Sequence, residues 1–269
     1  MLSVCATPIG NLEDVTLRVL RELAEADVVL CEDTRRTRIL LDRHGISARL
    51  LSYHEHNEAA RTAELLPRLQ AGERIALVSD AGLPAVSDPG ARLVAAVLDA
   101  GVPLTVLPGP SAVETALVAS GLVGERYEFL GYLPRGEKAL VSLWHELAGV
   151  PWPSVAFESP RRLPATLRSL ASVAPGRWVA VCRELTKQFE EVVRGRAGEV
   201  AARFAEPPKG EITIVVGGGG GGERAEPDAR QALEAVAELA ALGVGRGRAA
   251  ELVSRLTGVP RNRLYRASL

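Results

Sequence analysis

Polar segments with ligand-binding potential follow the apolar runs in the first half of the chain. They lie at residues 7–11, 32–35, 54–58, 79–84 and 108–111. The chain has no GxxxxGK[ST] motif, and no GxGxxG motif stands where a strand meets a helix, so a phosphate-binding nucleotide site is poorly supported. The segments supply prolines, small residues, carbonyls and carboxylates instead, which suit a ligand with a ribose, an adenine and a positive centre. S-adenosylmethionine fits that description.

Each titratable group in these segments has a structural interpretation beside the functional one. Glu32 and Asp33 precede two arginines and form either a surface ion-pair cluster or part of a site. Asp80 follows an apolar run and precedes a Gly-Leu-Pro turn, where turn stabilisation and ligand contact are equally reasonable. Asp88 stands before Pro89 and is interpreted as a helix N-cap.

Metal binding and nucleophilic hydrolysis are disfavoured. His54 and His56 form an HxH pair, but the chain has only two further histidines, so loop histidines that touch a substrate are expected rather than a metal site. No serine stands in a GxSxG elbow. The three cysteines are widely spaced in apolar segments and are expected to be buried and reduced.

Composition points to a protein of the cytoplasm. The chain has 269 residues, is 47% hydrophobic and carries a formal net charge of −1. No apolar run reaches the roughly 20 residues that a membrane span needs, and the N-terminus lacks signal-peptide features. We therefore expect a soluble, cytoplasmic protein of two domains, or two and an appendage.

Alternating elements position the polar segments. The spacing of apolar residues predicts strands at 3–6, 27–32, 48–52, 74–79 and 103–107, and helices at 15–26, 34–43, 57–71, 91–100 and 112–120. Alternation of this kind predicts a parallel sheet with helices on both faces. Ligands bind outside the carboxyl ends of such strands, so the polar segments should form one cleft.

The second half predicts a mixed sheet. Strands are expected at 127–133, 154–158, 178–184, 189–195 and 211–216, and the short connection at 185–188 indicates an antiparallel hairpin. The fold class is therefore α/β, with two α/β domains at 1–112 and 113–218.

A glycine run at 217–222 predicts a flexible linker. The tail beyond it predicts a small helical module over 225–269, with a helix–turn–helix pattern around residues 257–260. From Arg246 onward it holds six arginines and one acidic residue. This basic module indicates either nucleic-acid contact or a dimerisation hairpin.

Eight short motifs in fixed order resemble one known family. They are TPIGNL at 7–12, EDTR at 32–35, HEHNE at 54–58, SDAGxP at 79–84, LPGPS at 107–111, ESP at 158–160, RELTK at 183–187 and KGE at 209–211. Together they resemble the ribosomal RNA small subunit methyltransferase I family of the tetrapyrrole methylase superfamily. The resemblance runs from Val4 into the tail.

The resemblance implies a tetrapyrrole methylase-like fold that binds S-adenosylmethionine between two domains of a homodimer. It implies 2′-O-methylation of a cytidine ribose in the decoding region of 16S rRNA. By that resemblance the cofactor contacts fall on Pro8, Ile9, Gly10, Asp80, Gly82, Leu83, Ser111, Ala112, Phe157, Leu185 and Glu211. Leu83 and Phe157 stand where relatives usually carry Thr and Tyr, so a side-chain hydroxyl is missing at each position.

The expected reaction is in-line transfer of a methyl group to a ribose hydroxyl. Glu32, Asp33 and Glu158 are the candidates for the base, and the sequence does not choose among them. The partner would be 16S rRNA or the small ribosomal subunit, with no metal. Expected RNA contacts are Arg35, His54, His56, Lys187, Arg261, Arg263 and Arg266.

Two alternative functions stay open. The same fold could methylate a tetrapyrrole or a modified protein side chain, although neither substrate explains the basic tail. A non-catalytic RNA-binding assembly protein is a different class, and it leaves the five polar segments unexplained.

Overall fold

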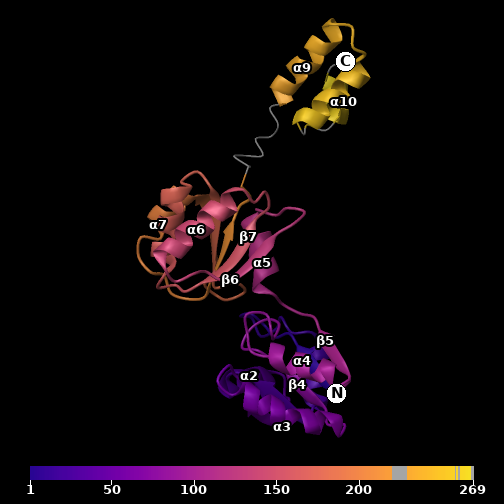
Figure 1. Cartoon of the computed structure of the whole chain (residues 1–269), viewed down its shortest axis with the longest axis vertical. Coiled ribbons are helices and arrows are strands. Elements are labelled where there is room, and N and C mark those ends of the chain that lie inside the picture. Colours follow the sequence, from indigo (N-terminus) through magenta and orange to yellow (C-terminus); the bar gives the residue numbers. More distant parts are fainter. Residues whose placement is uncertain (220–228, 258, 260, 268–269) are drawn as a thin grey trace. The chain divides into compact units, whose positions relative to one another are not determined.

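A computed structural model describes residues 1–219, 229–257, 259 and 261–267 (Figure 1). The chain divides into two compact units, Met1–Gly218 and Gly219–Leu269. The first unit contains two sheets, which we call the first lobe and the second lobe. The predicted boundary between residues 112 and 113 stays a prediction.

The first lobe is a parallel five-stranded sheet in the order β3-β2-β4-β1-β5. Its strands are β1 (Leu2–Cys5), β2 (Val28–Cys31), β3 (Leu50–Ser52), β4 (Ile75–Leu77) and β5 (Leu104–Leu107). The connecting helices are α1 (Leu17–Glu25), α2 (Thr34–Arg43), α3 (Glu58–Gln70) and α4 (Ala91–Asp99). The predicted alternation and the parallel sheet are confirmed.

Both faces of this sheet are covered. Along β1, Leu2 and Val4 pack in the apolar cluster that holds Leu65 of α3 and Leu93 of α4. Cys5 faces the opposite cluster, with residues of α1 and α2. Successive side chains of a strand point to opposite faces, so this short strand contributes to two cores at once.

The second lobe is a mixed sheet in the order β6-β7-β10-β8-β9. Its elements are α5 (Ala112–Ser120), β6 (Glu128–Tyr132), α6 (Glu137–Ala148), β7 (Ser154–Glu158), α7 (Leu163–Val173), β8 (Trp178–Arg183), β9 (Glu191–Arg196), α8 (Ala197–Arg203) and β10 (Ile212–Val216). Only β6 and β7 are parallel; the other neighbours are antiparallel. The predicted hairpin is the β8–β9 pair, so the two-domain α/β fold class is confirmed.

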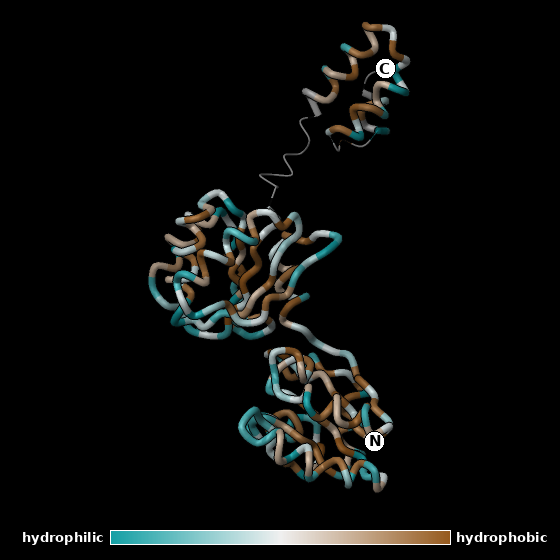
Figure 2. Tube along the Cα trace, viewed as in Figure 1, coloured by the Kyte–Doolittle hydropathy of each residue, from teal (hydrophilic) through white to brown (hydrophobic). Residues whose placement is uncertain are grey.

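One face of the second sheet joins the two lobes. Helices α6, α7 and α8 cover the opposite face. Helix α5 packs on the joining face, and Ile9 of the first lobe lies in the same apolar cluster as Val113 and Leu185. Figure 2 shows the hydrophobic segments concentrated on the strands inside each lobe. Burial of this shared cluster holds the two lobes together.

The C-terminal unit is a separate helical module of α9 (Ala229–Ala241), α10 (Arg246–Thr257) and α11 (Arg261–Ala267). Val236, Ala249, Val253 and Leu264 belong to its own core. The helices predicted on either side of residues 257–260 are confirmed. Residues 258 and 260, and residues 220–222 of the predicted linker, lie outside the described residues. Within the described chain, no helix is long and apolar enough to cross a membrane.

The predicted N-cap of one helix is wrong. Helix α4 begins at Ala91 after Gly90, whose φ of +138° makes it the N-cap. Asp88 therefore stands too far from the first turn to cap it. Ser111 is the N-cap of α5, and its hydroxyl donates to the Glu114 carboxylate and makes no cap bond with the backbone.

Candidate functional site

The loops that follow β1 and β4 are bonded into one unit. The Thr7 amide donates to the Gly82 carbonyl at 2.8 Å, and the Gly82 amide donates back at 3.0 Å. The Thr7 hydroxyl also donates to the Ser79 carbonyl at 3.0 Å. These bonds join two strand ends of the parallel sheet, so the cleft edge of the first lobe is preformed.

A turn of the second lobe, residues 184–187, reaches across to the first polar loop. The Asn11 amide donates to the Thr186 hydroxyl at 3.0 Å. A Cβ on Gly10 would lie 2.6 Å from Lys187 Cγ and 2.8 Å from the Leu185 carbonyl, so only glycine fits there. Thr186 itself has a φ of +64°. We call residues 184–187 the cross-lobe turn.

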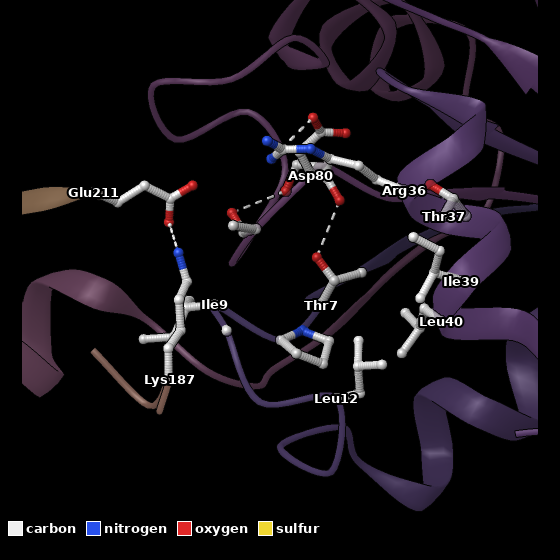
Figure 3. Close-up of a pocket in the computed structure, with 14 residues that line it drawn as sticks. Thr7, Ile9, Leu12, Arg36, Thr37, Ile39, Leu40, Asp80, Lys187 and Glu211 are labelled. Carbon is white, nitrogen blue, oxygen red and sulfur yellow. Dashed lines mark hydrogen bonds and ion pairs between the residues drawn. The ribbon is translucent and has the colours of Figure 1, made fainter. Parts of the chain in front are cut away.

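A cavity of about 250 Å³ lies between the two lobes at this contact (Figure 3). Helix α2 forms one wall, and Lys187 and Glu211 of the second lobe lie on the opposite side. The lining residues are Thr7, Pro8, Ile9, Gly10, Leu12, Arg36, Thr37, Ile39, Leu40, Ser79, Asp80, Ala81, Lys187 and Glu211. The predicted cofactor residues Pro8, Ile9, Gly10, Asp80 and Glu211 thus meet at one cavity.

Other predicted cofactor residues belong to the apolar clusters and do not line this cavity. Ala112, Phe157 and Leu185 belong to the apolar cluster shared by the lobes. Leu83 packs against the core of the first lobe. The methyl groups of Leu83 therefore serve the core, where the threonine of relatives would place a hydroxyl.

Asp80 and Asp33 are both tied to their own lobe. Asp80 Oδ1 accepts a hydrogen bond from the Asp33 amide at 3.1 Å, and Asp80 Oδ2 lies 3.5 Å from Arg36. The Asp33 carboxylate caps α2 and binds Arg35 Nη2 at 2.7 Å. That guanidinium lowers the pKa of Asp33 to about 2, which makes this carboxylate a weak proton acceptor.

Glu158 is a buried structural carboxylate. Its Oε1 accepts from the Ser159 amide and its Oε2 accepts from the Thr166 hydroxyl, both at 2.6 Å. Arg162 lies 3.2 Å from Oε2, and the Glu158 side chain is 0% exposed. Both oxygens are therefore engaged, and the end of β7 is fixed to α7.

Lys187 bridges two carboxylates of the second lobe. Its Nζ donates to Glu184 at 2.8 Å and to Glu211 at 2.9 Å. Burial lowers the pKa of Lys187, but the bonds to both carboxylates outweigh it and leave that pKa raised. Lys187 thus holds the cross-lobe turn, a structural role that competes with the expected contact to an RNA phosphate.

Two further residues, Asp88 of the first lobe and Tyr132 of the second, have raised pKa values, although neither lines the cavity. Burial, together with the charges of Glu32 and Asp80, raises the pKa of Asp88 to about 6, against an opposing hydrogen bond from Ser79. Burial and then the charge of Asp88 raise the pKa of Tyr132, which lies at the end of β6 in the second lobe. In the sequence, Asp88 stands just beyond the loop that follows β4. The N-cap interpretation did not identify it as a candidate site residue.

Of the other predicted RNA-binding residues, His54, His56 and Arg35 belong to the first unit, and none of these three lines the cavity. His54 pairs with Asn57 at 3.1 Å at the start of α3, and His56 is exposed beside it. Arg35 is 88% exposed despite its bond to Asp33. Arg261 and Arg266 are exposed on α11, whereas the Arg263 side chain lies outside the described residues.

The residues present fit a cationic cofactor with apolar and ribose parts. Carboxylates approach the cavity from both lobes, through Asp80 and Glu211. The shared apolar cluster, with Ile9 and Leu185, borders the same loops. Among the described residues, no group of three or more histidines, cysteines or carboxylates is arranged to hold a metal ion.

Comparison with known proteins gives one consistent result. The family model for tetrapyrrole (corrin/porphyrin) methylases matches residues 1–201. A ribosomal RNA small subunit methyltransferase I of Mesorhizobium japonicum is 44% identical over 273 residues, which covers 100% of this chain and 91% of that relative. The relative of that name in Thermotoga maritima is 44% identical over 221 residues, covering 81% of this chain and 98% of the relative.

Solved structures share the fold at low sequence identity. Diphthine synthase superimposes with a TM-score of 0.63 at 16% identity, covering 80% of this chain and 89% of that protein. Uroporphyrin-III C-methyltransferase of Thermus thermophilus, solved with S-adenosyl homocysteine, gives a TM-score of 0.56 at 19% identity, covering 80% of this chain and 96% of that protein.

Proposed function

This chain belongs to the ribosomal RNA small subunit methyltransferase I family, within the tetrapyrrole methylase superfamily, and on this premise we propose that it methylates 16S rRNA in the cytoplasm. The methyl donor is S-adenosylmethionine, and the acceptor is the 2′-hydroxyl of a cytidine ribose in the decoding region. The observation that carries the proposal is the 44% identity to a relative of that name over the whole chain.

The cavity supports the choice of cofactor. S-adenosylmethionine supplies a methyl group on a cationic sulfur, together with an adenosine moiety. Asp80 and Glu211 reach the cavity from the two lobes, each beside a cation that also lines it, Arg36 and Lys187, and Ile9 borders an apolar wall. These four charges balance, so the support for a sulfonium comes from the carboxylate and carbonyl oxygens at the cavity and not from a net charge.

The chain's own residues contribute mainly by positioning. The Thr7–Gly82 bridge fixes the first lobe, and the cross-lobe turn fixes the second lobe against it through Asn11. A preformed cleft holds donor and acceptor in line, which removes much of the entropic barrier to transfer. A ribose hydroxyl also needs a group to take its proton.

The three carboxylates that the sequence offers as base differ in availability. Asp33 is bound to Arg35, and Glu158 is buried with both oxygens engaged. Glu32 makes no hydrogen bond or ion pair with any residue that the structure describes. Burial and the charge of Asp80 raise the pKa of Glu32. Of the three, Glu32 alone is available to the substrate.

We assign RNA capture to exposed arginines of both units. Arg35 stands at the cleft edge of the first unit, and Arg261 and Arg266 stand on α11 of the second. The Thermotoga relative leaves a fifth of this chain unmatched, about the size of residues 219–269. The C-terminal unit is therefore proposed as an accessory that adds affinity, and the protein is proposed to act as a homodimer.

A labelled-methyl assay tests the proposal directly. Purified small subunits, naked 16S rRNA and a porphyrinogen are each incubated with the protein and S-adenosylmethionine. We expect label in RNA, recovered as a 2′-O-methylcytidine after nuclease digestion. Label in the porphyrinogen alone, or a methylated base instead of a ribose, contradicts the proposed function.

The accessory role of the C-terminal unit is tested by measuring RNA affinity. RNA affinity of Arg261→Ala/Arg266→Ala is compared with the wild type over a range of salt concentrations. Each lost phosphate contact reduces the salt slope by about 0.7–0.9. Unchanged affinity at every salt concentration assigns α11 to dimerisation instead.

A further inference from the structure

The cleft end of the second lobe carries three exposed cations outside the cavity. Arg135 follows β6, Lys138 lies in the first turn of α6, and Arg161 follows β7. None of the three makes a hydrogen bond or an ion pair with a residue that the structure describes. Among the described residues of the segments that follow β6 and β7, Glu137 is the one exposed acid, so this surface has an excess of positive charge. We call Arg135, Lys138 and Arg161 the basic rim.

The basic rim lies close to the wall of the cavity. Glu211, which lines the cavity, directly precedes β10, and Ile212 of β10 pairs with Glu158 at the end of β7. Neighbouring strands are about 4.8 Å apart, and β6 runs parallel to β7, so both strands end on the side of the cavity. Arg135 and Arg161 follow those two strand ends.

The first lobe approaches the end of β6 as well. A Cβ on Gly131 would lie 3.6 Å from Ser87 Oγ, which belongs to the loop that follows β4. The backbone of that loop is strained, because Ala85 and Ser87 have φ values of +70° and +63°, in the left-handed region. Strain of this kind persists where the surroundings over-determine the backbone. The basic rim therefore begins beside a fixed contact between the lobes.

A buried ion pair holds the two segments of the basic rim together. Arg162 Nη2 donates to the Pro134 carbonyl at 2.5 Å, which joins the segment after β7 to the segment after β6. The same guanidinium lies 3.2 Å from the buried Glu158 carboxylate. Arg135 follows Pro134 in the chain, and Arg161 precedes Arg162. The backbone is thus fixed next to both arginines, while their side chains remain in solvent.

Other cations of the second lobe are engaged with carboxylates. Lys187, the residue of this lobe that was expected to contact RNA, is held between two carboxylates. Arg183 and Arg203 are both bound to Glu191. A cation bound in this way must share or break a charge-assisted bond before it binds a phosphate. The cations of the basic rim have no such bond to lose.

We propose that the basic rim binds phosphates of the RNA strand that flank the reacting ribose, an inference that rests on the function proposed above. A ribose in the cleft is joined through phosphates to both neighbouring nucleotides, so the strand must leave the cleft past its edges. Arg35 stands at the edge of the first lobe, and the basic rim stands at the edge of the second. Guanidinium groups bind phosphate through paired N–H donors, and an ammonium binds it as a point charge. Such contacts fix the register of the strand without reading its sequence.

The first test measures RNA binding by the full-length protein. The affinity of Arg135→Ala/Arg161→Ala for naked 16S rRNA is compared with that of the wild type over a range of salt concentrations. We expect binding about tenfold weaker at low salt, and a salt slope smaller by about 1.4–1.8 because two phosphate contacts are lost. Arg135→Lys/Arg161→Lys keeps both charges and should keep the wild-type slope.

Methyl transfer then separates binding of the strand from the chemical step. The substrate is naked 16S rRNA or the small subunit, whichever accepts the label. For Arg135→Ala/Arg161→Ala we expect a KM for RNA about tenfold higher and a kcat within about threefold of the wild type, because phosphate contacts position the strand. Calorimetry should give unchanged affinity for S-adenosylmethionine, since neither arginine lines the cavity.

Controls separate this effect from a folding defect and from a general loss of charge. Urea denaturation of Arg135→Ala/Arg161→Ala should give the wild-type midpoint, because both side chains are exposed and unpaired among the described residues. Arg126→Ala removes an exposed arginine at the opposite end of β6, where it stacks on Trp152, and should bind RNA as the wild type does.

Three outcomes contradict the inference. Unchanged RNA affinity and salt slope in Arg135→Ala/Arg161→Ala, in a protein that still labels RNA, overturn the inference alone. An equal loss of affinity in Arg126→Ala also overturns it, because the position of the charge would then not matter. A wild-type protein that binds S-adenosylmethionine but labels no RNA overturns the proposed function and this inference with it.

Discussion

The two lobes bring the same kind of side chain to the cleft but pair it to different degrees: the first lobe pairs Asp33 with Arg35 and Asp80 with Arg36, and leaves two further carboxylates unpaired. In the second lobe, Glu158 is buried against Arg162, and Lys187 bridges Glu184 and Glu211. In the first lobe, Glu32 and Asp88 are unpaired among the described residues and repel each other. Pairing lowers the proton affinity of a carboxylate, whereas desolvation beside like charges raises it.

This contrast separates carboxylates that build the cleft from those that can react in it. A paired carboxylate fixes two segments of chain, as Glu158 does for β7 and α7. An unpaired carboxylate in a strained loop makes the folded state less favourable at neutral pH. The same carboxylate is ready to accept a proton. Four substitutions test this division.

The largest effect should come from the buried pair of the second lobe. Glu158→Ala leaves the Ser159 amide and the Thr166 hydroxyl without their acceptor and removes the carboxylate beside Arg162, and we expect a loss of about 3–5 kcal/mol in the free energy of unfolding. Urea denaturation measures this loss, and Glu158→Gln, which keeps an acceptor oxygen, should lose less. If Glu158→Gln were as stable as the wild type but over a hundredfold slower, Glu158 would be a reactive carboxylate and the contrast would fail.

The second-largest effect should come from a substitution at the contact between the lobes. Gly10→Val places atoms where Lys187 Cγ and the Leu185 carbonyl now lie, so the cross-lobe turn must move. A displacement of about 1 Å at the cleft should lower the methyl-transfer rate about a hundredfold. Gly176→Ala is the matched control, because its Cβ would meet nothing within 4 Å. Equal activity of the two variants would show that the cleft does not depend on the cross-lobe turn.

Asp88 offers a stability test that needs no substrate. Its folded pKa of about 6 lies above the 3.8 that is usual for an aspartate, so the folded state binds more protons between these values and stability falls as pH rises through that window. Asp88→Asn removes this cost and should be about 1–2 kcal/mol more stable than the wild type at pH 7, after allowance for solvent screening. The difference should vanish at pH 3.5. An Asn variant that is less stable at pH 7 would show Asp88 to be a structural carboxylate.

The smallest effect should come from Arg36. Its side chain is 58% exposed and lies 3.5 Å from Asp80, so solvent screens the pair. Arg36→Met should change the free energy of unfolding by less than about 1 kcal/mol, measured by the same denaturation. A loss as large as that of Glu158→Ala would mean that the first lobe also depends on paired carboxylates.

Much of this architecture follows from the chain's local patterns. Apolar periodicity located the strands of both lobes and the helices α1 to α5, because each pattern has the period of the element it forms, whereas α6, α7 and α8 of the second lobe were not predicted. The short connection after β8 fixed an antiparallel hairpin and hence a mixed second sheet. The shared edge of the parallel strands placed Ile9 and Asp80 at one site, and the resemblance to a known family added Glu211 of the second lobe.

The sequence by itself determined which residue types reach the cleft, but the tertiary structure decided their roles. Asp33, Asp88 and Glu158 are all carboxylates beside a strand end, and no local pattern distinguishes the one bound by Arg35 from the one left unpaired. Proton affinity depends on burial and on charges brought near by segments far apart in the chain, as Glu32 and Asp80 are brought to Asp88. Those distances exist only after both lobes have folded.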